Sequence, residues 1–234
     1  MPINLSPRLA AAANLADPTA VVADIGTDHG YIPIYLVKEK GVRHVIATDA
    51  NEDPLNKAKR MVQRFKLEAH ITLRLGNGLE VLEPGEATTL ILAGMGGALI
   101  TELLEASPVV ANQAQQLILQ PVQAVPVLRR YLATHGYRIH EEVLIQEKHR
   151  FYEIIVAKHE NLPVHEPEPV WLETGSFLKQ QPAAVARTFV SRKIRLFTQK
   201  YQGLSQADAP DPQQLSETFA LIEALKEELR WLKQ

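Results

Sequence analysis

Short apolar runs rich in β-branched residues alternate with amphipathic segments over the first 160 residues of this 234-residue chain. Strands that alternate with helices form parallel βαβ units, because each helix carries the chain back to the starting edge of the sheet. Ser6 is predicted to cap the first helix, with a proline in the first turn. The predicted strands are residues 20–25, 44–48, 71–75, 89–93 and 116–119, and the predicted helices are residues 5–15, 53–65, 98–105 and 125–134, with one more that opens near Tyr31.

The alternation ends with two strands in succession, at residues 137–146 and 152–158, with no room for a helix between them. Such a pair must form an antiparallel hairpin. A parallel sheet that ends in a hairpin is unusual for dinucleotide-binding dehydrogenases. It resembles the seven-stranded, Rossmann-like sheet of class I methyltransferases, and we expect an α/β fold of that kind.

A proline-bearing segment, residues 161–169, follows the last predicted strand and is typical of a linker. Beyond it, two apolar stripes step by four and three residues on either side of a loop at residues 203–212. This spacing predicts a C-terminal antiparallel helical hairpin, a coiled coil. We therefore expect a catalytic domain at residues 1–160 and a helical hairpin at residues 161–234. The stripes are Val190, Ile194, Phe197, Tyr201 and Leu204, then Leu215, Phe219, Ile222, Leu225, Leu229 and Leu232.

The composition is that of a globular protein and fits a reducing compartment. Hydrophobic residues make up 46% of the chain and charged residues 22%, and there is no cysteine. Disulfides, thiolate zinc sites and a cysteine nucleophile are thereby excluded. The N-terminus lacks the regions of a signal peptide, and the most apolar run, residues 90–100, is too short for a bilayer. We expect a soluble cytoplasmic protein with no membrane segment and no metal site.

The most informative stretch, residues 21–31, leads from an apolar strand through an acidic residue and a glycine-bearing turn into a helix. Ligands of open α/β sheets bind at this carboxyl end of the strands. Gly26 permits a tight turn, and Gly30 would allow close approach of a ligand. Asp24 is placed to accept a hydrogen bond from an ammonium group, which S-adenosylmethionine carries and NAD lacks. An ordinary strand-to-helix turn is the alternative, since the G-x-G-x-x-G pattern is absent.

Three later turns add polar or glycine residues at the same predicted edge. Asp49 ends the second strand, where an acidic side chain can bind both ribose hydroxyls, although a helix cap is the alternative. Asn77 and Gly78 follow the third strand and offer an amide to an adenine edge, unless they form a plain turn. After the fourth strand, the string AGMGG at residues 93–97 leaves room beside a cofactor, and Met95 suits packing on a purine or sulfonium. Four such turns predict an S-adenosylmethionine site.

These turns resemble the motifs of the bacterial tRNA adenine-22 N1-methyltransferases. The first string is specific, because Asp28 replaces a glycine that is common in other methyltransferases. Two positions depart from the family pattern, since Asn77 stands where aspartate is expected and Val122 where asparagine is expected. The matching strings are DIGTDHGYIP at residues 24–33, LSxRL at 5–9, AGMGG at 93–97, LQP at 119–121 and YEII at 152–155.

The resemblance implies S-adenosylmethionine as cofactor, tRNA as substrate and N1 of adenine 22 as the methylated atom. It also implies that His29 contacts the cofactor. Arg8 is a candidate for binding the cofactor carboxylate, with a solvated arginine as the alternative. The expected cofactor-binding residues are Arg8, Asp24, Gly26, Thr27, His29, Gly30, Asp49, Ala50, Asn77, Gly78, Ala93, Gly94 and Met95.

The chemistry implied by this resemblance asks little of the protein. Adenine N1 has a lone pair and a sulfonium is an activated methyl donor, so proximity, orientation and exclusion of water should suffice. N1 lies on the Watson–Crick edge, and the base must therefore be unpaired or flipped out. Asp28 is the candidate to stabilise the cationic product or take a proton from N6, and Tyr31 to stack on the base. Turn capping by Asp28 and simple packing by Tyr31 are the alternatives.

A purely basic stretch lies in the predicted hairpin, although the net charge of the chain is −2. Residues 177–203 carry basic side chains on several faces and no acidic ones, and the segment after them is acidic. Ion pairs between the basic and the acidic helix explain part of this pattern. Contact with RNA phosphates explains why basic side chains lie on several faces of the helix. We expect tRNA as a partner and a monomer or weak dimer. The expected RNA-binding residues are Arg187, Arg192, Lys193, Arg195 and Lys200.

Three other functions stay open on the sequence. A methyltransferase of another RNA, a small molecule or a protein would share the cofactor site without needing the basic hairpin. A nicotinamide-dependent oxidoreductase would share the glycine turn and Asp49 but should carry G-x-G-x-x-G. A non-catalytic RNA-binding protein on the same fold would bind tRNA and fail to bind S-adenosylmethionine.

Overall fold

The computed structural model describes residues 3–232, which form two compact units. The first unit ends at Glu166 and the second begins at Pro167. The division therefore falls inside the expected linker at residues 161–169. The separate functions expected for the two parts stay predictions.

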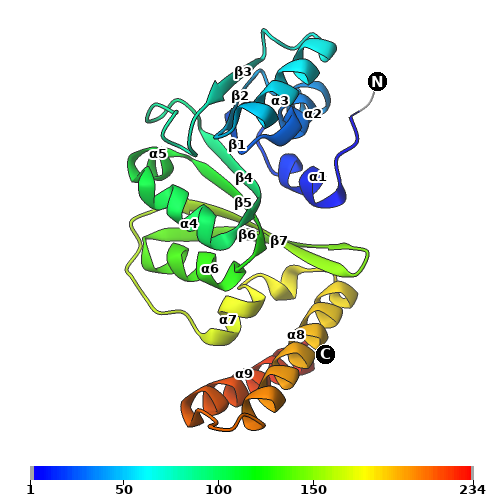
Figure 1. The fold of residues 1–234 in the computed structure, drawn as a ribbon, viewed down its shortest axis with the longest axis vertical. Helices are drawn as coiled ribbons and strands as arrows, with labels where there is room; N and C mark the ends of the chain where they lie inside the picture. Colours follow the sequence, from blue (N-terminus) through cyan, green and yellow to red (C-terminus); the bar gives the residue numbers. More distant parts are fainter. Residues whose placement is uncertain (1–2, 233–234) are drawn as a thin grey trace. The chain divides into compact units, whose positions relative to one another are not determined.

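A seven-stranded mixed sheet forms the centre of the first unit (Figure 1). Its strands are β1 (Val21–Ile25), β2 (His44–Asp49), β3 (Ile71–Leu75), β4 (Thr89–Gly96), β5 (Gln116–Gln123), β6 (Tyr137–Glu147) and β7 (Arg150–His159). The order across the sheet is β3-β2-β1-β4-β5-β7-β6. Strands β1 to β5 pair in parallel, and β7 pairs antiparallel with both β5 and β6. The predicted parallel sheet with a terminal hairpin is confirmed.

Helices cover both faces of this sheet (Figure 1). Because side chains of a strand point alternately to opposite faces, each strand contributes to two cores. In β1, Val22 belongs to the core with α1, α2 and α3, whereas Ala23 and Ile25 belong to the core with α4, α5 and α6. The helices are α1 (Pro7–Asn14), α2 (Tyr31–Lys40), α3 (Glu52–Phe65), α4 (Gly97–Ala106), α5 (Pro108–Gln113) and α6 (Val125–Thr134), and a 3₁₀ turn, η1 (Asp28–Gly30), precedes α2.

The start of α1 is held differently from the prediction. Ser6 occupies the N-cap position, but its hydroxyl makes no capping hydrogen bond and is buried without a partner among the described residues. Instead Glu147, at the end of β6, accepts a hydrogen bond from the Arg8 backbone N–H at 2.6 Å. A carboxylate is favourable at this end of a helix, where free N–H groups concentrate positive charge.

A buried group of three charged side chains fixes α6 to the β-hairpin of β6 and β7. Arg129 is 1% exposed, and its Nε donates to Glu142 of β6 at 2.7 Å. Its Nη2 donates to Glu153 of β7 at 2.5 Å. Burial lowers the pKa of Arg129, but the two carboxylates outweigh this effect and raise it above its ordinary value. Glu153 belongs to the YEII string, so this string has a role in packing.

The second unit contains α7 (Pro169–Thr174), a 3₁₀ turn η2 (Leu178–Gln180), α8 (Ala183–Ser205) and α9 (Pro212–Trp231). Helices α8 and α9 lie side by side as an antiparallel pair, so the expected hairpin is confirmed (Figure 1). Asp211 starts α9 by accepting hydrogen bonds from the N–H groups of Gln213 and Gln214. Along the predicted stripes, Val190 is buried, whereas Phe219 is 53% exposed.

Within residues 3–232, no helix combines the length and apolar character that crossing a membrane requires. The same part of the chain has no group of three or more histidine, aspartate or glutamate side chains arranged to hold a metal ion.

Candidate functional site

The expected site residues meet where the order of the strands reverses. β1 pairs with β2 on one side and with β4 on the other. The helices that follow these central strands lie on opposite faces, because α2 packs in one core and α4 in the other. A crevice for ligands forms at the carboxyl ends of strands in this arrangement. The turns after β1, β2, β3 and β4 all lie along that edge.

The turn after β1 is fastened to the neighbouring strand β2. The N–H groups of Gly26 and Thr27 both donate to the Thr48 carbonyl, at 2.9 and 2.8 Å. Gly26 has a φ of 72°, which side chains other than glycine rarely adopt. A Cβ at Gly26 would also overlap the Met95 Cε, which reaches across from the turn after β4. Met95 and the first glycine of the site are thus in contact.

Asp24 is a buried carboxyl with a perturbed pKa. It is 2% exposed near the end of β1. Burial raises its pKa to about 7, the nearby Thr27 hydroxyl opposes this rise, and the charge of Asp49 adds to it. A buried acid gains stability in its ionised form when a positive group pairs with it. The carboxyl is therefore suited to an ammonium group.

Two buried hydroxyls lie beside this turn. The Thr27 hydroxyl is near enough to the Asp24 carboxyl to lower its pKa, whereas the Thr48 hydroxyl has no hydrogen-bond partner among the described residues. Buried polar groups without partners cost free energy, so such groups are expected where a ligand or water binds. There is also room at Gly94, where a Cβ would meet a single side chain, the Arg8 Nη1 at 3.7 Å. These features fit the methionine part of the expected cofactor.

Asp49 uses one carboxylate oxygen within the fold and leaves the other open. It is 8% exposed at the end of β2, and its Oδ1 accepts a hydrogen bond from the Asn51 N–H at 2.9 Å. Asn51 is the N-cap residue of α3, so this oxygen helps to start the helix. The other oxygen has no donor among residues 3–232. One carboxylate oxygen is thus open to a ribose hydroxyl, beside the exposed Ala50.

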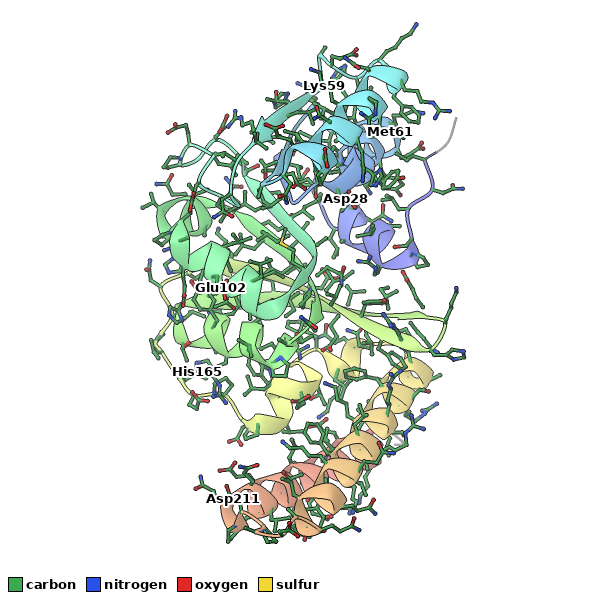
Figure 2. All side chains as sticks on the ribbon, viewed as in Figure 1. Asp28, Lys59, Met61, Glu102, His165 and Asp211 are labelled. Atoms are coloured by element: carbon green, nitrogen blue, oxygen red, sulfur yellow. The ribbon has the colours of Figure 1, made fainter. Side chains whose placement is uncertain are left out.

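The residues expected near the reacting base lie together on η1 and the first turn of α2 (Figure 2 labels Asp28). The Asp28 carboxylate is 67% exposed and lies 3.5 Å from the His29 Nε2. The His29 ring stacks on Tyr31, with centroids 5.3 Å apart and planes inclined by 10°. The Asp28 side chain caps neither η1 nor α2, so the turn-capping alternative lacks a hydrogen bond in its favour.

Three glycines of the expected site are explained by packing between elements. A Cβ at Gly30 would lie 3.2 Å from the Ala58 Cβ of α3. A Cβ at Gly78 would lie 2.5 Å from the Leu103 Cδ2 of α4. A Cβ at Gly97 would overlap a backbone carbonyl in the turn before α6. These contacts, together with the positive φ angles of Gly30 (71°) and Gly78 (53°), account for the three glycines without a ligand.

The turn after β3 places an amide and an apolar side chain at the edge. Asn77 is exposed, and its Nδ2 donates weakly to the Glu80 Oε1 at 3.4 Å. Leu75, the last residue of β3, is 48% exposed. Ala93 lies in β4, which β2 and β1 separate from β3 in the sheet, and is partly buried. Leu75 and Asn77 together offer an apolar surface and an amide to a flat ring.

Arg8 is held in place by residues of β5 and β7. Its Nη1 donates to the Gln120 Oε1 at 2.6 Å, and its guanidinium lies 5.2 Å from the centre of the Tyr152 ring. Gln120 is fully buried and belongs to the LQP string, while Tyr152 begins the YEII string. Arg8 is partly buried and has partners within the fold, while its contact with the cofactor carboxylate stays a prediction. The roles of Gln120, Tyr152 and Glu147 were not predicted, although Gln120 and Tyr152 lie in the matched strings.

The basic side chains of α8 differ in how strongly the fold uses them. Lys193 forms an ion pair with Glu173 of α7 at 2.6 Å, and both side chains are less than 20% exposed. Arg187 donates to the Leu232 carbonyl at 3.2 Å, near the end of α9. By contrast, Arg195 and Lys200 are exposed, and Arg192 is partly buried. The structure therefore gives Lys193 and Arg187 roles within the unit.

A family model described as "Methyltransferase domain" matches residues 5–155. The chain is 33% identical over 234 residues to the tRNA (adenine(22)-N(1))-methyltransferase of Bacillus subtilis. That alignment covers 96% of this chain and 97% of the B. subtilis protein.

Solved structures show the same similarity. The crystal structure of the B. subtilis M1A22 tRNA methyltransferase TrmK superposes with a TM-score of 0.87 and 34% identity, covering 97% of this chain and 100% of that one. The structure of M. capricolum TrmK in complex with S-adenosyl-homocysteine gives a TM-score of 0.80 and 28% identity, covering 97% of this chain and 98% of that one.

Proposed function

The chain belongs to the family of tRNA (adenine(22)-N(1))-methyltransferases, and from this membership we propose that it transfers the methyl group of S-adenosylmethionine to N1 of an adenine in tRNA. The observation that carries the proposal is the buried Asp24 carboxyl, which lies near the buried Thr27 and Thr48 hydroxyls at the carboxyl edge of a methyltransferase sheet. A nicotinamide-dependent oxidoreductase is not supported, because the family is that of a methyltransferase. We place the reaction in the cytoplasm, in line with the tRNA-modifying relatives.

The residues of the first unit would hold the cofactor at three points. Asp24 would bind the ammonium group, and the Thr27 hydroxyl lies at the same turn. Arg8, fixed by Gln120, would bind the carboxylate beside Gly94. The open oxygen of Asp49 would bind a ribose hydroxyl. S-adenosylmethionine supplies an activated methyl group when bound.

The exposed residues of η1 and α2 would orient the target base. Tyr31 is 39% exposed and is stacked on His29, so its ring is partly preorganised to pack against a flat base. Asp28 supplies a negative charge beside it, which would stabilise the cationic ring that methylation at N1 creates. Since N1 already has a lone pair, positioning and exclusion of water are the main tasks of these residues.

Calorimetry with S-adenosylmethionine tests the cofactor, and mass mapping of tRNA nucleosides after reaction tests the product. We expect saturable binding and 1-methyladenosine at one position. Failure to bind the cofactor would favour a non-catalytic RNA-binding protein. Methylation of a small molecule or a protein, with unmodified tRNA, would contradict the proposed substrate. Whether the protein is a monomer or a weak dimer is a separate expectation, which sedimentation can measure.

Asp49→Ala is expected to weaken binding of S-adenosylhomocysteine by roughly 1.5–3 kcal/mol, about 10- to 100-fold, because a charge-assisted hydrogen bond is lost. Asp49→Asn keeps an acceptor for the Asn51 N–H and separates this loss from any effect on α3. Asp53→Ala is the matched control, since Asp53 is an exposed acid in the first turn of the same helix. Unchanged affinity in folded Asp49→Ala would refute the assignment.

The double change Arg195→Glu and Lys200→Glu is expected to weaken tRNA binding without altering cofactor affinity. These side chains are exposed on α8, and each phosphate contact contributes roughly 0.7–0.9 to the slope of log K against log salt. The slope should therefore become shallower by about 1.5. Filter binding over a series of salt concentrations measures it.

Lys226→Glu with Arg230→Glu is the matched control for this charge reversal. Both residues are exposed on α9, so the net charge of the protein changes equally. If the α9 variant loses as much tRNA affinity as the α8 variant, the proposed assignment of RNA contact to α8 is wrong. If neither loses affinity, RNA recognition belongs to the first unit.

A further inference from the structure

Side chains link the ends of three neighbouring strands in the first unit. The Met95 Cε lies over Gly26, which joins the turn after β4 to the turn after β1. On the other side, Gln123 at the end of β5 pairs in register with Gly96. A Cβ at Gly96 would lie 3.3 Å from the Gln123 Nε2 and 3.6 Å from its Cγ. The Gln123 side chain therefore lies across Gly96, next to the candidate site.

Other polar groups at the end of β5 are already engaged. The Gln120 amide accepts a hydrogen bond from Arg8 and donates to the Pro121 carbonyl at 3.0 Å. Val122, which is 44% exposed, has no polar group to offer. Gln123 is exposed, and no described residue makes a hydrogen bond with its side chain. An amide that lies over a glycine and has both functional groups open can bind a ligand edge.

We propose that Gln123 forms a purine-edge subsite, which binds N6 and N7 of the adenine to be methylated. This inference rests on the proposed function and adds a residue that reads the base. The amide Oε1 would accept a hydrogen bond from the N6 amino group, and Nε2 would donate to N7. Glutamine makes this pair of bonds to adenine in nucleic-acid complexes, because its donor and acceptor are spaced like N7 and N6.

The geometry of adenine makes this contact compatible with the reaction. N6 and N7 lie on the Hoogsteen edge, so N1 on the Watson–Crick edge stays open to the methyl donor. Guanine carries an acceptor at position 6 and would face the amide oxygen with a second acceptor. The subsite therefore selects adenine over guanine.

The test uses full-length protein and a ligated tRNA with adenosine or 7-deazaadenosine at the position that the wild type methylates. 7-Deazaadenine lacks the N7 acceptor and keeps N1 and N6. We expect the modified base to lower kcat/KM about fivefold to tenfold more in the wild type than in Gln123→Ala, as for loss of one hydrogen bond. For ordinary tRNA, Gln123→Ala should have a kcat/KM about tenfold below that of the wild type. A different intrinsic reactivity of N1 affects both proteins equally and cancels in this comparison.

Gln115→Ala is the matched control, because Gln115 is an exposed glutamine just before the opposite end of β5. Cofactor affinity should be unchanged in both variants, which shows that the fold persists. Equal responses of wild type and Gln123→Ala to 7-deazaadenosine, or unchanged kcat/KM in Gln123→Ala, would overturn the subsite alone. If the wild type methylates no adenine of tRNA, the proposed function fails and the subsite with it.

Discussion

Asp24→Asn is expected to weaken binding of S-adenosylhomocysteine by roughly 2–5 kcal/mol, about 30-fold or more, while it makes the free protein more stable at pH 8. The loss of affinity follows because a buried charge pair is deprived of one partner. S-adenosylhomocysteine keeps the ammonium and carboxylate groups of the donor and lacks the reactive methyl group, so binding is measured without turnover. Calorimetry gives the affinity, and thermal unfolding gives the stability.

The gain in stability follows from the raised pKa of Asp24. Its pKa is about 7 in the folded protein, above the ordinary value of 3.8. Between these values the folded state binds more protons than the unfolded state, so the contribution of this group falls as pH rises. That contribution is fully present below pH 4 and lost above pH 7. Asparagine has no charge to lose or gain and avoids this loss. At pH 8 the free energy of unfolding of the variant should therefore exceed that of the wild type by at least about 1 kcal/mol, which raises Tm by roughly 2–4 °C.

The pH profile of ligand binding separates an ion pair from a neutral hydrogen bond. In the wild type, affinity should fall about tenfold for each pH unit below 7, because the carboxyl must lose its proton to bind an ammonium group. It should also fall above pH 8, where the ligand amine loses its charge. The affinity of Asp24→Asn should not fall below pH 7. In the matched control Asp17→Asn, where the changed residue is exposed, the affinity should fall at low pH as in the wild type. If the affinity of the wild type does not change between pH 5.5 and 8, the proposed ion pair between Asp24 and the ligand is wrong.

Local patterns predicted the sheet well and its irregular parts less well. Alternating strands and helices reflect residue periodicity, which is encoded within ten to fifteen residues. By contrast, β4 continues to Gly96 because a bulged register with β5 extends its pairing beyond the predicted end at residue 93. The six-residue α5 was not predicted, since it is too short to display a helical stripe. Such features depend on tertiary pairing.

The site shows the same division between local and distant causes. The acidic and glycine residues after the strands were recognised because strand ends converge in any parallel sheet. The partner of the Arg8 N–H could not be recognised, because Glu147 lies 139 residues away. Packing explains why Gly30 and Gly97 are glycines, although the sequence suggested space for a ligand. The ion pair of Lys193 with Glu173 likewise joins two helices whose contact the sequence does not reveal.

Arg129→Met is expected to lower the free energy of unfolding by roughly 3–5 kcal/mol, the usual cost of removing one partner from a buried ionic group. Arg129 is 1% exposed and serves the carboxylates of Glu142 and Glu153, so methionine would fill the space while leaving two buried negative charges. Chemical denaturation measures the loss. Because α6 then loses its link to β6 and β7, unfolding should also begin at lower temperature.

Arg130→Met is the matched control one residue along the same helix. Arg130 pairs with Glu166, and both side chains are more than half exposed, so this change should cost less than about 1 kcal/mol. Neutralising the stranded acids in Arg129→Met/Glu142→Gln/Glu153→Gln should recover part of the stability, because uncompensated buried charge causes most of the loss. If Arg129→Met is no less stable than Arg130→Met, the buried charges do not fix α6 to the hairpin. If the triple variant is less stable than Arg129→Met, the loss arises from broken hydrogen bonds and packing instead of stranded charge.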